Sequence, residues 1–88
     1  HAGARTNLGL ILMQSGNVHE ATEEFRKVVD AWPMDAKARN SLGVALAAQG
    51  RREEAIREFE TALRLKPDYH SARANLNKVL GDSPEPAR

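Results

Sequence analysis

The chain has 88 residues, a formal net charge of +1 and no cysteine. This length allows one domain at most, and the lack of cysteine excludes disulfides and thiolate metal sites. A charge so close to zero excludes the strong uniform field with which a basic protein attracts nucleic acid or an anionic membrane. Because only four residues are aromatic, the core must consist mainly of aliphatic side chains, which favours helices over sheets.

The sequence contains no segment that would place it in or across a membrane. No apolar run approaches the roughly 20 residues that a membrane-spanning helix needs, and no signal-peptide pattern opens the chain. The first residue is His1 rather than Met, so we expect a piece of a longer protein. A soluble module is expected, with the cytoplasm as the default compartment, while the compartment, parent protein and source are not assigned by the sequence.

Five helices are predicted in chain order, near residues 2–15, 18–31, 36–49, 52–65 and 70–81. In the fourth helix, apolar residues recur at helical spacing from Ala55 through Phe59 to Leu63. Gly16 and Gly50 stand just after the first and third helices, where glycine most easily adopts the left-handed conformation that ends a helix. The chain is therefore expected to be all-α.

The ends of these helices carry their own signals. Asn17, with Glu20 three residues later, is typical of a capping box for the second helix. A proline ends the second and fourth helices, and Asp35 and Asp68 are expected to cap the helices that follow. A Gly-x-x-Pro sequence ends the last helix and leaves a polar tail at residues 82–88.

The sequence repeats itself after 34 residues, without a gap. The identical residues include Leu-Gly, Gly, Ala, Phe and Pro positions, and a third copy begins at residue 70. Gly9 and Gly43 each cost about 1 kcal/mol against Ala in a helix interior. We therefore expect a neighbouring helix backbone to come close there, with Ala21 and Ala55 as the small facing partners. A phenylalanine four residues after each alanine would fill the space between units.

These positions resemble the 34-residue signature of the tetratricopeptide repeat family. The resemblance covers residues 2–81 and implies a right-handed α-solenoid in a single domain. It would comprise two helix-turn-helix repeats, residues 2–35 and 36–69, and a capping helix, residues 70–81.

The sequence departs from the family pattern at two positions. Arg5, Arg39 and Arg73 stand where the family favours an aromatic residue at the fourth position of a repeat. Val18 and Arg52 stand where it favours an aromatic residue near the start of the second helix. Both departures reduce the expected packing and stability without threatening the fold.

The resemblance implies a protein or peptide partner held in a concave face, which the first helix of each pair lines. The signature residues themselves are packing residues and name no partner. By family analogy, the peptide-binding residues are expected to be Asn7, Leu10, Met13, Asn40, Ser41, Val44, Asn75 and Lys78.

Asn7 and Asn75 are separated by two repeat lengths and therefore occupy equivalent positions. Such a row of amides resembles the asparagine ladders with which some repeat arrays hold an extended peptide backbone. Ser41 interrupts the row, and ordinary exposed polar side chains are the commoner alternative. The family's carboxylate clamp needs Lys, Asn, Asn, Lys and Arg at five groove positions. These positions hold Thr6, Leu10, Ser41, Ser71 and Asn75 here, so we exclude that partner class.

Trp32 is either an exposed contact residue or an aromatic side chain folded back over a helix end, and the second interpretation is favoured because large aromatics are mostly buried. His1, His19 and His70 lie at unrelated repeat positions, so no metal site is expected. No phosphate-binding loop, nucleophile or paired-carboxylate cleft predicts a cofactor or an enzymatic activity.

The leading hypothesis is a protein-interaction scaffold. One alternative is the accessory array of a larger enzyme, such as a glycosyltransferase. Another is self-assembly, in which Leu8, Ile11 and Leu12 of the uncapped first helix pack against a second copy. Nucleic-acid binding ranks last, because the arginines at residues 51–57 are interspersed with glutamates.

Overall fold

The computed structural model describes residues 2–81, and every secondary-structure element in that range is a helix. The predicted helix ends agree with the observed ones to within one residue, whereas the predicted polar tail, 82–88, lies outside the described residues. The helices are α1 (Ala2–Gln14), α2 (Val18–Ala31), α3 (Ala36–Ala48), α4 (Arg52–Leu65) and α5 (His70–Leu80).

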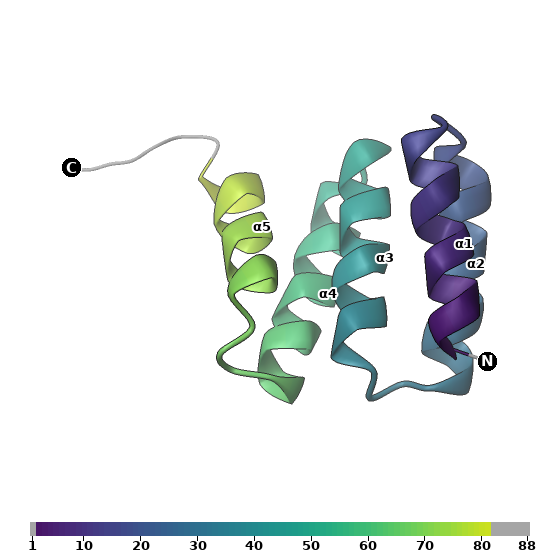
Figure 1. Cartoon of the computed structure of the whole chain (residues 1–88). Coiled ribbons are helices and arrows are strands. Elements are labelled where there is room, and N and C mark those ends of the chain that lie inside the picture. Colours follow the sequence, from purple (N-terminus) through teal and green to yellow (C-terminus); the bar gives the residue numbers. More distant parts are fainter. Residues whose placement is uncertain (1, 82–88) are drawn as a thin grey trace.

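The helices form two layers (Figure 1). Each helix packs against the next one in the chain, and α1, α3 and α5 also contact one another in succession. The backbones of α2 and α4 do not come into contact. Because a curved stack is shortest on the side where its helices are closest, α1, α3 and α5 form the concave layer and α2 and α4 the convex layer.

The core lies between these layers and is built from apolar stripes at helical spacing. Its largest fully buried side chains come from α2, α3 and α4. Full burial of one such side chain contributes about 1.5–3 kcal/mol to stability. These side chains are Phe25, Val28, Leu42, Leu46 and Phe59.

The two glycines inside helices lie under aromatic rings. A Cβ atom added to Gly9 or Gly43 would lie less than 3.0 Å from ring atoms of Phe25 or Phe59, respectively. We predicted that a neighbouring helix backbone requires glycine at these two positions. This prediction is wrong, because the close neighbour is the phenylalanine ring of the same repeat. Both rings are at most 1% exposed, so neither can swing away.

The left-handed glycines end their helices as predicted. Gly16 and Gly50 have φ of 84° and 77°. After Gly16, the Asn17 N–H donates to the Leu12 carbonyl at 2.8 Å, which satisfies an otherwise unpaired carbonyl at the end of α1. The equivalent bond in the second repeat joins Arg51 to Leu46 at 2.9 Å. One glycine thus turns the chain from the first helix of a repeat into the second.

One of three predicted helix caps is confirmed. The Asp35 carboxylate accepts a hydrogen bond from the Ala38 N–H at 3.1 Å. Asn17 is at the N-cap position of α2, but its side chain makes no cap bond. Its backbone N–H, which the Glu20 side chain would accept in a capping box, donates to the Leu12 carbonyl instead. Asp68 does not cap α5 either. It could be the N-cap only of a helix that begins at residue 69, whereas α5 begins at His70 and its N-cap residue is Tyr69.

The arginines that replace the expected aromatic residue join the two helices of each repeat. Arg5 Nη1 lies 2.9 Å from Glu24 Oε1, and Arg39 Nη1 lies 3.1 Å from Glu58 Oε1. Both partners recur after 34 residues, so the two repeats make the same ion pair. A partly exposed pair of this kind contributes about 0–1 kcal/mol. The departure from the family pattern at this position therefore has a structural role.

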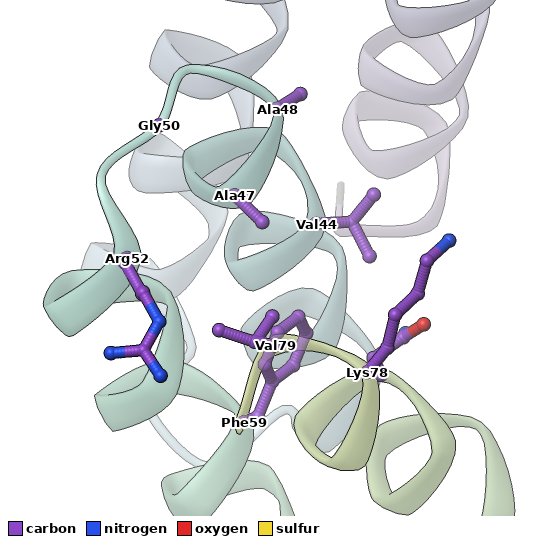
Figure 2. Close-up of a pocket in the computed structure, with 9 residues that line it drawn as sticks. Val44, Ala47, Ala48, Gly50, Arg52, Phe59, Lys78 and Val79 are labelled. Atoms are coloured by element: carbon purple, nitrogen blue, oxygen red, sulfur yellow. The ribbon is translucent and has the colours of Figure 1, made fainter. Parts of the chain in front are cut away.

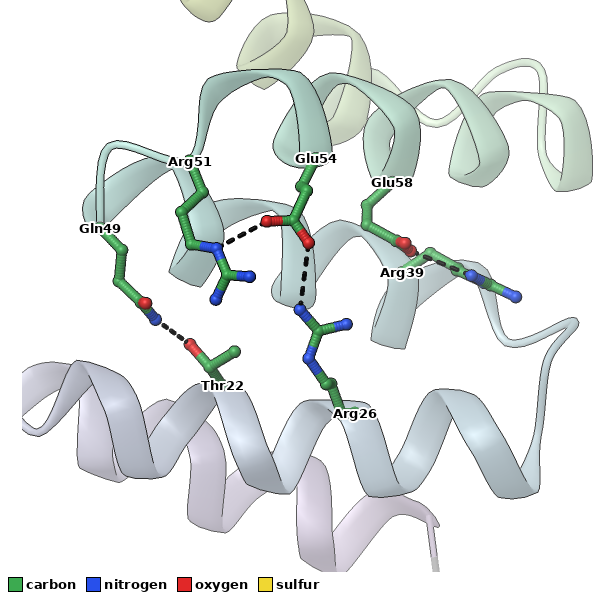
Figure 3. Close-up of polar contacts among 7 residues, drawn as sticks. All are labelled: Thr22, Arg26, Arg39, Gln49, Arg51, Glu54 and Glu58. Atoms are coloured by element: carbon green, nitrogen blue, oxygen red, sulfur yellow. Dashed lines mark hydrogen bonds and ion pairs between the residues drawn. The ribbon is translucent and has the colours of Figure 1, made fainter.

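Side chains bridge the convex layer where the helix backbones stand apart (Figure 3). The Glu54 carboxylate lies 2.6 Å from Arg51 Nε and 3.4 Å from Arg26 Nη2 of the preceding repeat. The Gln49 amide donates to the Thr22 hydroxyl. Partial desolvation raises the pKa of Glu54, but the hydrogen bonds and charges of the two arginines outweigh this effect and lower its pKa overall.

We predict that Gly43→Ala destabilises the fold, although alanine is ordinarily about 1 kcal/mol better than glycine in a helix interior. The new methyl group overlaps the immobile Phe59 ring, and overpacking of this kind costs about 1–3 kcal/mol. Urea unfolding monitored by circular dichroism measures the change. The neighbouring Val44→Ala provides the control, because that side chain is 36% exposed and its truncation introduces no overlap, so it should cost less stability than Gly43→Ala. A more stable Gly43→Ala variant would contradict this packing.

We also predict that Glu54 makes stability depend on pH in the acidic range. Its folded-state pKa is lowered, so its ion pairs contribute fully above the pKa of an unfolded glutamate and are lost as pH falls through the folded-state value. Glu54→Gln should therefore be less stable than wild type at pH 7, and the difference should vanish in acid. Thermal unfolding across pH tests this. The exposed Glu53→Gln is the control, and an equal pH profile for both variants would refute the bridge.

Candidate functional site

The eight predicted binding residues all lie on the concave layer, in α1, α3 and α5. The structure brings six of them together around a cavity of about 290 Å³: Leu10, Met13, Asn40, Ser41, Val44 and Asn75. Lys78 lines a second cavity, of about 490 Å³, which shares Val44 and Asn75 with the first. Asn7 lines neither cavity but is exposed on the same helix layer.

The second cavity lies where α5 meets α3 and α4 (Figure 2). Its apolar wall consists of Val44, Ala47, Ala48, Phe59 and Val79. Its charged lining residues are Arg52 and Lys78, whose side chains Figure 2 shows on either side of Phe59 and Val79. This cavity combines an apolar wall with positive charge at its margin.

Sequence reasoning missed Arg52, Phe59 and Val79 as lining residues of this cavity. Family analogy assigns the groove to selected positions of the first helix of each pair, whereas Arg52 and Phe59 belong to α4. A signal existed at Arg52, because an arginine stands there where the preceding repeat has Val18.

Three polar side chains join α3 to α5 in the first cavity. The Asn40 carbonyl oxygen accepts a hydrogen bond from the Asn75 amide at 3.0 Å, and the Asn40 amide donates to the Ser71 hydroxyl at 3.3 Å. Asn40 is only 7% exposed, so its hydrogen-bonding groups serve mainly to hold the two helices together. The polar groups that line this cavity and take no part in these two hydrogen bonds include the remaining donor and acceptor of Asn75 and the side chains of Ser41 and Gln14. The exposed amide of Asn7 lies on the same helix layer, outside the cavity.

Trp32 lies on the surface, contrary to prediction. Its side chain is 43% exposed, and Met34 beside it is 81% exposed. Trp32 is the C-cap residue of α2, where its backbone N–H donates to the Val28 carbonyl at 2.7 Å. Pro33 follows in the turn before α3, and the exposed part of the Trp32 side chain is available for contact with a partner.

Neither a metal cluster nor a membrane span is found between residues 2 and 81. No three His, Asp or Glu side chains in this range lie close enough together to hold a metal ion. The helices there are also too short or too polar to cross a bilayer.

Comparison with solved structures places the same architecture in other proteins. MamA AMB-1 superposes with a TM-score of 0.80 at 32% sequence identity, over 93% of this chain and 45% of that one. YrrB, described as a TPR protein with an unusual peptide-binding site, superposes with a TM-score of 0.79 at 30% identity, over 84% of this chain and 38% of its own. The chain thus spans less than half the length of these two proteins.

At the level of sequence, a comparison with curated proteins gives no match. The model of the tetratricopeptide repeat family, by contrast, matches residues 6–70, which is most of the chain. The chain therefore belongs to the tetratricopeptide repeat family, and its helices form the α-solenoid of that family.

Proposed function

We propose that this chain is a scaffold module that binds a protein or an extended peptide on the concave face of α1, α3 and α5. One observation carries the proposal. Six residues chosen from the sequence as contact residues converge on one cavity, although they come from three different helices. Neighbouring concave cavities that combine apolar walls with a few polar groups are the usual form of a binding site.

The physical character of the face suits a peptide. Leu10 and Val44 are 38% and 36% exposed, so they offer apolar surface that an incoming side chain can cover. Asn7 and Asn75 offer amide groups that can both donate to and accept from a peptide backbone. YrrB, which shares this fold, is described as having a peptide-binding site, and this likeness supports the proposal by analogy.

Binding rather than catalysis is the role we propose for the chain. The described side chains on the concave layer are mostly amide, hydroxyl and aliphatic groups. None is a carboxylate or a thiol that could act as a base or a nucleophile within the two cavities.

We predict that Leu10→Ala combined with Val44→Ala weakens peptide binding by at least about tenfold, because each lost methylene contact contributes up to about 0.8 kcal/mol. Peptides selected from a random displayed library on wild-type protein provide the ligands, and fluorescence anisotropy measures their affinities. Both side chains are more than one-third exposed, so the variant should still fold.

The matched control is Met34→Ala combined with Leu65→Ala, which truncates two exposed apolar side chains outside the cavities. This control should bind like wild type. Equal affinity of both double variants for every selected peptide would remove the concave face as the binding site.

Self-association is a second candidate, which a separate observation favours. Leu8 and Ile11 of α1 are 45% and 58% exposed, so this helix presents apolar surface that a second copy could cover. We expect sedimentation equilibrium to show a concentration-dependent dimer that Leu8→Ser with Ile11→Ser abolishes. A monomer at millimolar concentration would end this candidate and leave the peptide proposal intact.

A further inference from the structure

The two helix layers differ sharply in charge. The concave helices α1, α3 and α5 contain no Asp or Glu, whereas α2 and α4 contain four each. The Lys and Arg residues of the concave layer are Arg5, Lys37, Arg39, Arg73 and Lys78. All the Lys, Arg, Asp and Glu side chains in the three helices of the proposed binding surface are thus basic.

Part of this charge is neutralised within the fold. Arg5 and Arg39 are paired with Glu24 and Glu58 of the convex layer. Lys78 forms no ion pair with another residue in the range 2–81, and neither does Arg52 at the start of α4. These two cations line the larger cavity, and no carboxylate of residues 2–81 lines either cavity.

The repeat supplies an internal control for these two residues. The residue 34 positions before Arg52 is Val18, and the residue 34 positions before Lys78 is Val44. The first junction, where α3 follows the first repeat, therefore has valine at both positions. The second junction, where α5 follows the second repeat, has a cation at both. Because the fold is built with valine at both positions, its packing does not require the positive charges.

Arg52 and Lys78 are both exposed, so water hydrates their charges while the cavity is empty. A ligand that covers the apolar wall displaces part of this water, which costs free energy. An anionic ligand offsets this cost, since its carboxylates pair with the cations while its apolar part covers the wall. The remaining hydrogen-bonding groups of Asn75 lie in the same cavity.

We propose that the cavity between α3, α4 and α5 binds a peptide segment in which an apolar side chain lies between Asp or Glu residues. The apolar side chain covers Val44, Ala48 and Val79, and the carboxylates pair with Arg52 on one side and Lys78 on the other. Side-chain carboxylates fit better than a single terminal carboxylate, because the two cations come from different helices on either side of the apolar wall (Figure 2). This inference rests on the proposed function and adds the chemistry of the partner.

The test uses variants that give the second junction the residues of the first. Arg52→Val with Lys78→Val removes both charges, and Val18 and Val44 show that valine is compatible with the fold at the equivalent positions one repeat earlier. Arg57→Val with Arg73→Val is the matched control, because it removes two exposed arginines from the same two helices outside the cavity. Each protein selects peptides from the same random displayed library.

Wild type and the control should enrich peptides with acidic residues on both sides of an apolar residue. The valine variant should keep the apolar preference and lose the acidic one. A peptide of sequence Glu-Glu-Leu-Glu-Glu, acetylated and amidated so that its ends are uncharged, should bind the valine variant at least about tenfold more weakly than wild type at low salt. That difference should shrink as salt is raised, because added ions screen exposed charges.

Three outcomes would overturn the inference: enrichment of neutral or basic peptides on wild type, equal affinity of the acidic peptide and its Gln-Gln-Leu-Gln-Gln counterpart, or equal binding by both charge variants. In each case, sensitivity of the selected peptides to Leu10→Ala with Val44→Ala would still support the concave face as a peptide site. Binding of anionic phosphatidylserine vesicles or of RNA by wild type, without any acidic peptide, would also overturn it and assign the cations to a different partner.

Discussion

The contact between a phenylalanine ring and a glycine sets the geometry on which the whole solenoid depends. Phe25 lies over Gly9, and Phe59 lies over Gly43, each within one repeat. An aromatic ring can occupy this place only if the facing helix has no Cβ atom there. The same pair of residue types therefore sets the distance between the two helices in both repeats. Because this distance is the same in each repeat, the helices of the concave layer are regularly arranged.

Polar side chains supplement the apolar packing between the repeats, which share one buried core. Arg26 reaches Glu54, and Thr22 receives a hydrogen bond from Gln49, across a gap that the backbones of α2 and α4 do not close. The residues 34 positions after Thr22 and Arg26 are Ile56 and Glu60, so this bridge does not recur in the sequence. Partly exposed polar contacts of this kind are individually weak, so the apolar packing of α2 against α3 provides most of the cohesion between the repeats.

The difference between local signals and tertiary contacts explains how far the sequence predicts the structure. Helix ends follow from local signals such as Gly16 and Gly50, and these were predicted to within one residue. Caps depend on the chain path around a single residue, so the incorrect predictions fell at Asn17 and Asp68. The hydrogen bonds from Asn40 to Asn75 and Ser71 could not be predicted, because they depend on how α5 is rotated against α3.

The repeat also separates residues that build the fold from residues that are free for another role. Arg5 and Arg39 depart from the family pattern, but they recur after 34 residues, and each makes the same ion pair with a recurring glutamate. Arg52 and Lys78 do not recur, since valine stands at both positions one repeat earlier. A charge that packing explains should appear in every copy, whereas a charge confined to one junction needs a cause specific to that junction. For the cavity between α3, α4 and α5, a ligand of opposite charge is such a cause.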